Sequence, residues 1–149
     1  MVHITKDKKI YIKILYWGPA AGGKTTSVDT LFRLCKEKEK DWVPTGNLTK
    51  IAMASGSTLY FDRGIFQSRK QKNIYFHCYT VAGQSRFSPL RKKVFSGTDG
   101  VIFVADSQNS RLQDNIDSLK ELKRVADGKL VKEIPLLFML NKRDLDDLI

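Results

Sequence analysis

Residues 18–25 read Gly-Pro-Ala-Ala-Gly-Gly-Lys-Thr, a match to the pattern G-x-x-x-x-G-K-T. Glycines let such a loop wrap closely around a phosphate group, and the amides at the start of the following helix point at the same anion. In this pattern Lys24 reaches the β- and γ-phosphates, and the Thr25 hydroxyl ligates Mg²⁺. The sequence therefore predicts that this stretch binds a nucleoside phosphate. The predicted ligands are Gly18, Ala21, Gly22, Gly23, Lys24, Thr25 and Thr26, and Lys24 is also a candidate catalytic residue.

A second polar motif, Asn141-Lys142-Arg143-Asp144, directly follows an apolar run. An ionised aspartate only accepts hydrogen bonds, so Asp144 can clamp the two adjacent donors of guanine, N1–H and the exocyclic amine. Adenine presents an acceptor at N1 and would leave the carboxylate unpaired, which is costly. Asn141 can either bond the base edge or tie this loop to the phosphate loop, and the Lys142 stem can cover the base. The motif favours guanine over adenine, with Asn141, Lys142 and Asp144 as base ligands.

A third motif, Thr80-Val81-Ala82-Gly83-Gln84, ends a strand-like run. The Gly83 amide can approach a γ-phosphate, and Gln84 can orient the water that attacks it. Thr58 lies 22 residues before Thr80, so a hairpin would bring both positions to the phosphates. Thr58 is then the side chain that moves in to ligate Mg²⁺ when a γ-phosphate is present. These positions predict hydrolysis, with Gly83 and Gln84 as catalytic candidates and Thr25 and Thr58 as metal ligands.

Apolar periodicity indicates the elements that position these motifs. Alternating or continuous apolar runs predict strands, and apolar residues at helical spacing predict helices. The predicted strands cover 10–17, 58–66, 73–80, 100–105 and 134–140, and the predicted helices cover 26–38, 88–95 and 112–125. The polar stretch 41–56 predicts no element, and the runs at 100–105 and 134–140 are typical of buried strands. We expect an α/β fold with an open, mostly parallel sheet, one antiparallel edge strand and flanking helices.

Composition narrows the class of protein. The 149 residues are enough for one domain, and 26 Lys and Arg against 16 Asp and Glu give a net charge of +10. We interpret this charge mainly as solvated basic faces, with an acidic partner or an anionic membrane surface as the alternative. The chain has no nucleic-acid motif, so no nucleic-acid partner is expected. Cys35 and Cys78 have no metal-like spacing and predict reduced thiols. No apolar run is long enough to cross a bilayer, so we expect a cytoplasmic protein.

Together these motifs resemble those of Ras-superfamily small GTPases of the P-loop NTPase class. Several strings resemble more narrowly the mutual-gliding (MglA-type) GTPases of bacteria and archaea. They are the Gly-Pro start of the loop and residues 58–62, 79–84, 100–107 and 141–145. The resemblance implies a switch that binds GTP or GDP with Mg²⁺ and hydrolyses GTP. It also implies a role in cell polarity and motility and a dimeric roadblock-type activator, and it leaves the effector unidentified.

Three departures from that family shape the expectation. Ser57 stands where relatives usually carry an arginine that supplies charge in the transition state, and Ala20 occupies a position that is glycine in many relatives. Both departures predict slow hydrolysis without an activator. The sequence also ends five residues after Asp144, so the final strand and helix of the family are expected to be missing.

Two alternatives remain beside the hydrolysing switch. A GTP-binding scaffold with negligible hydrolysis is favoured by Ser57, Ala20 and the expected missing end, and disfavoured by Gln84. A P-loop kinase of a small metabolite would need an acidic activating residue and an arginine-bearing lid, for which the sequence offers no candidates.

Overall fold

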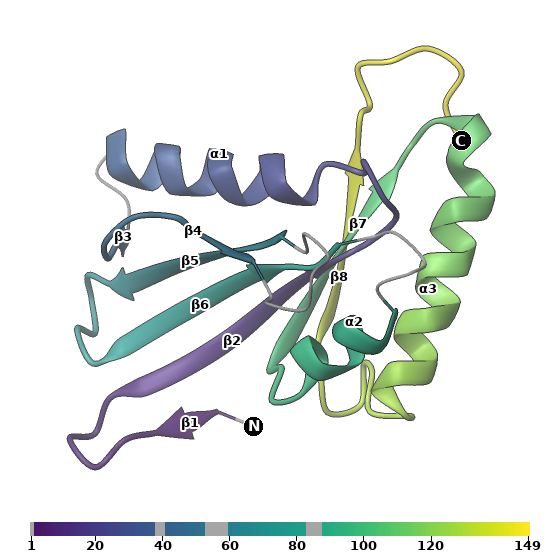
Figure 1. The fold of residues 1–149 in the computed structure, drawn as a ribbon. Helices are drawn as coiled ribbons and strands as arrows, with labels where there is room; N and C mark the ends of the chain where they lie inside the picture. Colours follow the sequence, from purple (N-terminus) through teal and green to yellow (C-terminus); the bar gives the residue numbers. More distant parts are fainter. Residues whose placement is uncertain (1, 38–40, 53–59, 83–87) are drawn as a thin grey trace.

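The structure is a computed structural model that describes residues 2–37, 41–52, 60–82 and 88–149. Within these residues eight strands form one mixed sheet in the order β3-β5-β6-β2-β7-β8, with β1 paired to β2 and β4 paired to β5 (Figure 1). The strands are β1 (His3–Ile4), β2 (Ile10–Trp17), β3 (Trp42–Pro44), β4 (Thr49–Ala52), β5 (Tyr60–Ser68), β6 (Ile74–Thr80), β7 (Gly100–Asp106) and β8 (Leu136–Asn141). The helical elements are α1 (Lys24–Glu37), α2 (Ser88–Phe95), the 3-10 helix η2 (Asn109–Arg111) and α3 (Leu112–Ala126). None of the described helices is long and apolar enough to cross a lipid bilayer.

Parallel strands form the centre of the sheet and bring the predicted motifs together. Strand β2 lies between β6 and β7, and β8 pairs with β7, all in parallel register. Parallel strands end at the same edge of a sheet, so the loop after Trp17 lies beside the ends of β7 and β8. Asp106 and Asn141 are register partners at that edge. The predicted open, mostly parallel α/β fold is confirmed.

The antiparallel side of the sheet is wider than predicted. The expected hairpin is present as β5 and β6, which pair antiparallel from Arg63 with Tyr79 to Gln67 with Tyr75. The short strands β3 and β4 also pair with β5, although the polar stretch 41–56 predicts no strand. The outer edge of β5 carries backbone N–H and C=O groups that need partners, and an adjacent extended segment can supply them whatever its side chains.

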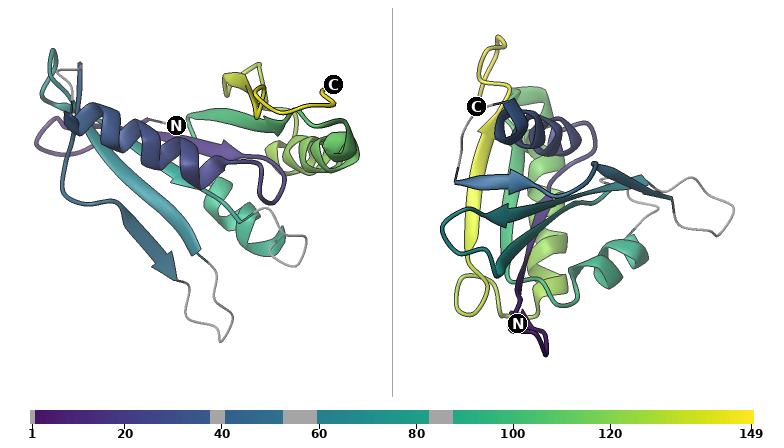
Figure 2. Two further views of the ribbon diagram at one scale, coloured as in Figure 1. Left: turned by 90° about the horizontal axis from the view of Figure 1, so that it is seen from above. Right: turned by 90° about the vertical axis from the view of Figure 1, so that its left-hand side faces the viewer.

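Helix α1 covers one face of the sheet, and α2 and α3 cover the other (Figures 1 and 2). Side chains alternate along β2, so Tyr16 points towards α1, whereas Leu15 and Trp17 point towards α2 and α3. The cluster under α1 consists of Tyr16, Val28, Cys35, Phe66, Cys78 and Val104. The cluster under α2 and α3 consists of Leu15, Trp17, Val81, Phe95, Val101, Phe103, Ala105, Leu122, Ala126 and Ile134. Cys35 and Cys78 are free thiols inside the core, as predicted.

The prediction that the last strand is buried is wrong. In β8, Leu137, Phe138 and Leu140 are 61%, 51% and 61% exposed. Among the described strands β8 lies at the edge of the sheet, with β7 on one side. Leu136 and Met139 do pack against the two core clusters. Apolar composition alone does not distinguish a strand covered on both faces from one at an edge.

Candidate nucleotide-binding site

The loop between β2 and α1 approaches its neighbours so closely that two positions require glycine. Gly18 has a φ of +153°, and a Cβ there would lie 2.3 Å from the Val104 carbonyl oxygen. Gly23 has a φ of +101°, and a Cβ there would lie 2.1 Å from Asn141 Nδ2. Side chains rarely tolerate either the backbone conformation or the contact. The glycines of the motif therefore allow the loop to pack against β7 and against the end of β8.

Lys24 begins α1 and is 6% exposed. Its ammonium donates to the carbonyl oxygens of Gly18 at 2.8 Å and Pro19 at 2.6 Å. Burial disfavours the charged form, and Arg91 and Arg111 repel it, so the pKa of Lys24 falls to about 8. The ammonium thus lies folded across the loop and is bonded to two of its carbonyl groups.

The Asn-Lys pair of the second motif contacts the phosphate loop directly. Asn141 Nδ2 donates to the Gly22 carbonyl at 2.9 Å, and Lys142 Nζ donates to the Ala21 carbonyl at 2.7 Å. Of the two roles predicted for Asn141, the structure shows the tie to the phosphate loop. Asp144 lies exposed in the turn after β8. The phosphate and base motifs are therefore parts of one site.

Asp106 is a central residue of this site, to which sequence reasoning assigned no role although its position predicts a place at the ligand-binding edge of the sheet. Its side chain is 0% exposed and accepts hydrogen bonds from Lys142 Nζ at 2.8 Å and from the Gln108 backbone N–H at 3.1 Å. Burial by itself would raise the pKa of Asp106, but the bonds from Lys142 and Gln108 hold it below its ordinary value. Asn115 fixes the backbone around it, accepting from the Asp106 N–H at 2.9 Å and donating to its carbonyl at 2.7 Å. Its place at the end of an apolar strand was the available signal.

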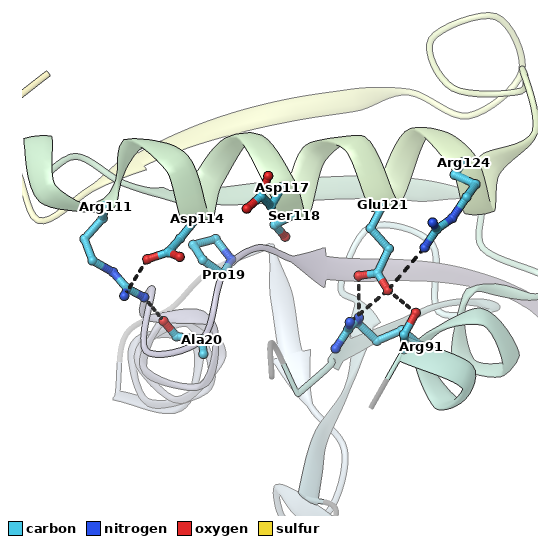
Figure 3. A pocket seen from close by; sticks show the side chains of 10 residues that line it. Pro19, Ala20, Arg91, Arg111, Asp114, Asp117, Ser118, Glu121 and Arg124 are labelled. Carbon is cyan, nitrogen blue, oxygen red and sulfur yellow. Dashed lines mark hydrogen bonds and ion pairs between the residues drawn. The ribbon is translucent and has the colours of Figure 1, made fainter. Parts of the chain in front are cut away.

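Arg111, also missed by sequence reasoning, donates through Nη2 to the Ala20 carbonyl at 2.6 Å. It sits at one end of a pocket of about 490 Å³ between the phosphate loop, α2 and α3 (Figure 3). Towards the other end of the pocket, Glu121 accepts from Arg91 Nε at 2.7 Å and Nη2 at 2.8 Å. Arg91 Nη1 donates to the Ala82 carbonyl at 2.7 Å. This chain of contacts links α3 to the residue just before Gly83.

Five further predicted site residues are Thr25, Thr26, Thr58, Gly83 and Gln84. Thr25 and Thr26 follow Lys24 in the first turn of α1 and are exposed. The remaining predicted residues, Thr58, Gly83 and Gln84, lie outside the described residues, so their predicted roles stay predictions. In the described parts of the chain, no three His, Cys, Asp or Glu side chains gather into a metal-binding group. Mg²⁺ is commonly held by one or two protein oxygens together with phosphates and water, and an exposed Thr25 hydroxyl fits such a shared site.

Comparison with known proteins agrees with this geometry. The model of the ADP-ribosylation factor family matches residues 1–149. Mutual gliding-motility protein MglA of Myxococcus xanthus is 35% identical over 146 residues, which cover 93% of this chain and 71% of that protein. ADP-ribosylation factor-like protein 4A of Homo sapiens is 30% identical over 135 residues, covering 89% of this chain and 58% of that protein. The mouse protein of the same name gives the same values, so the chain spans a little over half the length of these two relatives. The chain belongs to the ADP-ribosylation factor family, within the Ras superfamily of small GTPases.

Proposed function

We propose that this chain is a switch that binds GTP and hydrolyses it to GDP and phosphate. Family membership supports a guanine-nucleotide-binding GTPase. The observation that carries the proposal is the direct contact of Asn141 and Lys142 with the carbonyls of Gly22 and Ala21. Those two bonds hold the predicted base motif against the predicted phosphate loop. A nucleotide has both a base and phosphates, so binding it requires the two motifs to lie side by side.

Separate residues of the site have proposed roles in binding the phosphates, Mg²⁺ and the attacking water. The Lys24 ammonium, which now bonds to Gly18 and Pro19, would transfer to the β- and γ-phosphates. Mg²⁺, when bound, neutralises phosphate charge, and the Thr25 and Thr58 hydroxyls are its proposed protein ligands. The Gly83 amide and the Gln84 side chain would place the γ-phosphate and the attacking water.

The proposal extends to the rate of GTP hydrolysis, the activator, and the cellular role and location of the protein. Hydrolysis is slow without an activator, because Ser57 supplies no guanidinium and the Ala20 methyl would crowd the attacking water, Gln84 or an incoming arginine. A roadblock-type dimer is the proposed activator, and the relative named for gliding motility supports a role in motility and polarity. The net charge of +10 supports attraction of a cytoplasmic form to an anionic membrane surface.

Calorimetric titration of the nucleotide-stripped protein with GTP, GDP and ATP, each with Mg²⁺, tests the proposal. We expect binding of both guanine nucleotides and exclusion of ATP. Asp144→Asn should reduce the preference for guanine, since an amide can no longer accept from both guanine donors. Asp146→Asn is the matched control, because Asp146 is an equally exposed carboxylate two residues further on. Equal binding of ATP and GTP, or no nucleotide binding at all, would refute the proposal.

A further inference from the structure

Five consecutive carbonyl groups of the phosphate loop, from residue 18 to residue 22, accept hydrogen bonds from side chains. Lys24 bonds to the first two, and Lys142 and Asn141 bond to the last two. The middle carbonyl, that of Ala20, is held by Arg111. Lys24, Asn141 and Lys142 belong to the nucleotide-binding motifs, whereas Arg111 belongs to none of them and comes from the end of η2.

The Arg111 guanidinium is itself fixed by two carboxylates. Nη1 lies 2.6 Å from Asp114 Oδ2 in the first turn of α3, and Nε lies 3.6 Å from Asp106 Oδ2. A guanidinium is planar and presents its donors in a rigid fork, so one side chain can hold several acceptors in a fixed arrangement. Figure 3 shows Arg111 reaching from the start of the α3 helix to Asp114 and Ala20. The side chain therefore connects the start of α3 to the middle of the phosphate loop.

Asp106 couples this contact to the base motif. The same carboxylate oxygen, Oδ2, faces Arg111 Nε at 3.6 Å and Lys142 Nζ at 2.8 Å. Arg111 and Lys142 in turn hold the neighbouring carbonyls of Ala20 and Ala21. The fully buried carboxylate of Asp106 therefore contacts both Arg111 and Lys142, the two cations that donate to adjacent carbonyl groups of the loop.

The contact also bears on how the loop presents its amides. In a trans peptide the C=O and the following N–H point in opposite directions. Holding the Ala20 carbonyl towards α3 therefore turns the Ala21 N–H away from α3. Ala21 has a φ of +57°, which is unfavourable for a residue with a side chain and persists where the surroundings enforce it. Arg111 and Lys142, on either side of this residue, supply that restraint.

We propose that Arg111 is a positioning residue for guanine nucleotide binding, which holds the phosphate loop in its binding conformation through the Ala20 carbonyl. The proposal rests on the proposed function, since it assumes that this loop binds the nucleotide. Arg111 touches the backbone of the loop and acts through it.

The test compares Arg111→Gln with Arg124→Gln, which removes the same charge from the last turn of α3. Arg124 is a suitable control because its side chain is 75% exposed and lies 4.0 Å from its Glu121 partner. Release of a fluorescent GDP analogue should be about 10- to 100-fold faster in Arg111→Gln, the range for losing one charge-assisted hydrogen bond. Arg124→Gln should match the unmodified protein. Arg111→Lys keeps a positively charged donor but loses the planar fork of the guanidinium, so its rate of GDP release should lie between those of the other two variants.

Hydrogen exchange of the Gly22 amide in the nucleotide-free protein gives a readout that does not depend on nucleotide. That amide donates to the Pro19 carbonyl at 3.2 Å, and its exchange should accelerate in Arg111→Gln and not in Arg124→Gln. If the unmodified protein binds no guanine nucleotide, the proposed function fails, and the exchange experiment still decides whether Arg111 restrains the loop. If it binds GDP but both variants release GDP at the same rate, the role of Arg111 is refuted while the proposed function stands.

Discussion

The burial of Lys24 makes the stability of the nucleotide-free protein depend on pH in a predictable way. Its pKa is about 8 in the folded chain, against an ordinary value of 10.5. Between these two values the unfolded chain binds the proton and the folded chain does not. Unfolding therefore becomes less favourable as the pH rises through this window, because stability increases with pH wherever the unfolded state binds more protons.

The size of the effect follows from the two pKa values. For a folded pKa of about 8 and an unfolded pKa of 10.5, the Lys24 contribution to the free energy of unfolding rises by roughly 1.4 kcal/mol from pH 7 to pH 9 and by roughly 2.5 kcal/mol from pH 7 to pH 10. Other groups also titrate in this range, so the quantity to measure is a difference between variants. Lys24→Met removes the titrating group and retains an unbranched apolar stem.

Urea unfolding at pH 7, 8, 9 and 10 supplies the measurement, since urea adds no ionic strength. The free energy of unfolding of the original protein minus that of Lys24→Met should rise with pH by the stated amounts. Lost hydrogen bonds to Gly18 and Pro19 shift this difference by a constant and leave its slope unchanged. Lys36→Met, an exposed change in the same helix, is the matched control for the removal of a lysine side chain. A difference for Lys24→Met that stays constant from pH 7 to pH 10 would refute the reasoning.

Three further predictions come from the same contacts. GDP affinity should be about tenfold weaker at pH 9 than at pH 7. The reason is that the phosphates bind the charged Lys24 ammonium, which is mostly deprotonated above pH 8 in the folded chain. Calorimetric titration at both pH values tests this, and equal affinities would contradict it. Gly23→Ala should lower the free energy of unfolding by about 1–3 kcal/mol and abolish detectable GDP binding, because the new Cβ would collide with Asn141. Unchanged GDP binding would contradict the close contact between Gly23 and Asn141. Glu121→Ala should cost about 3–5 kcal/mol in urea unfolding, because it removes the carboxylate that pairs with the buried guanidinium of Arg91. A loss typical of an exposed ion pair would contradict that.

The sequence was sufficient for those features that depend on local pattern. The strand at Ile10–Trp17 and the helix at Ser88–Phe95 have the predicted bounds, because each has clear apolar periodicity between turn residues. Helix α3 ends at Ala126, one residue beyond the predicted range 112–125, with Asp127 in the left-handed conformation as its C-cap. The glycine pattern also located the phosphate loop, because its backbone conformation restricts which residues can occur there.

Features that depend on contacts between distant segments were missed. Arg111 and Ala20 lie 91 positions apart, and no spacing rule connects them. The exposure of Phe138 depends on which strands flank β8, which its own apolar sequence does not encode. The strands β3 and β4 pair with the edge of β5, and Trp42 of β3 packs against the core cluster under α1. Neither the edge nor that cluster follows from the mostly polar composition of the stretch 41–56.

The state of Lys24 connects stability with ligand binding. Its ammonium rests on two carbonyl dipoles and is repelled by Arg91 and Arg111, so it is held where a negative charge would be more favourable. A phosphate supplies that charge, and the same interaction that raises the pKa of Lys24 also stabilises the fold. Deprotonation of Lys24 raises the free energy of unfolding by roughly 2.5 kcal/mol between pH 7 and pH 10. A ligand present at 100 times its dissociation constant raises it by about 2.7 kcal/mol, an effect of similar size. At pH 7 the folded chain gains that stabilisation by binding an anion instead of by losing a proton. Saturating GDP should therefore remove the pH slope that distinguishes the original protein from Lys24→Met.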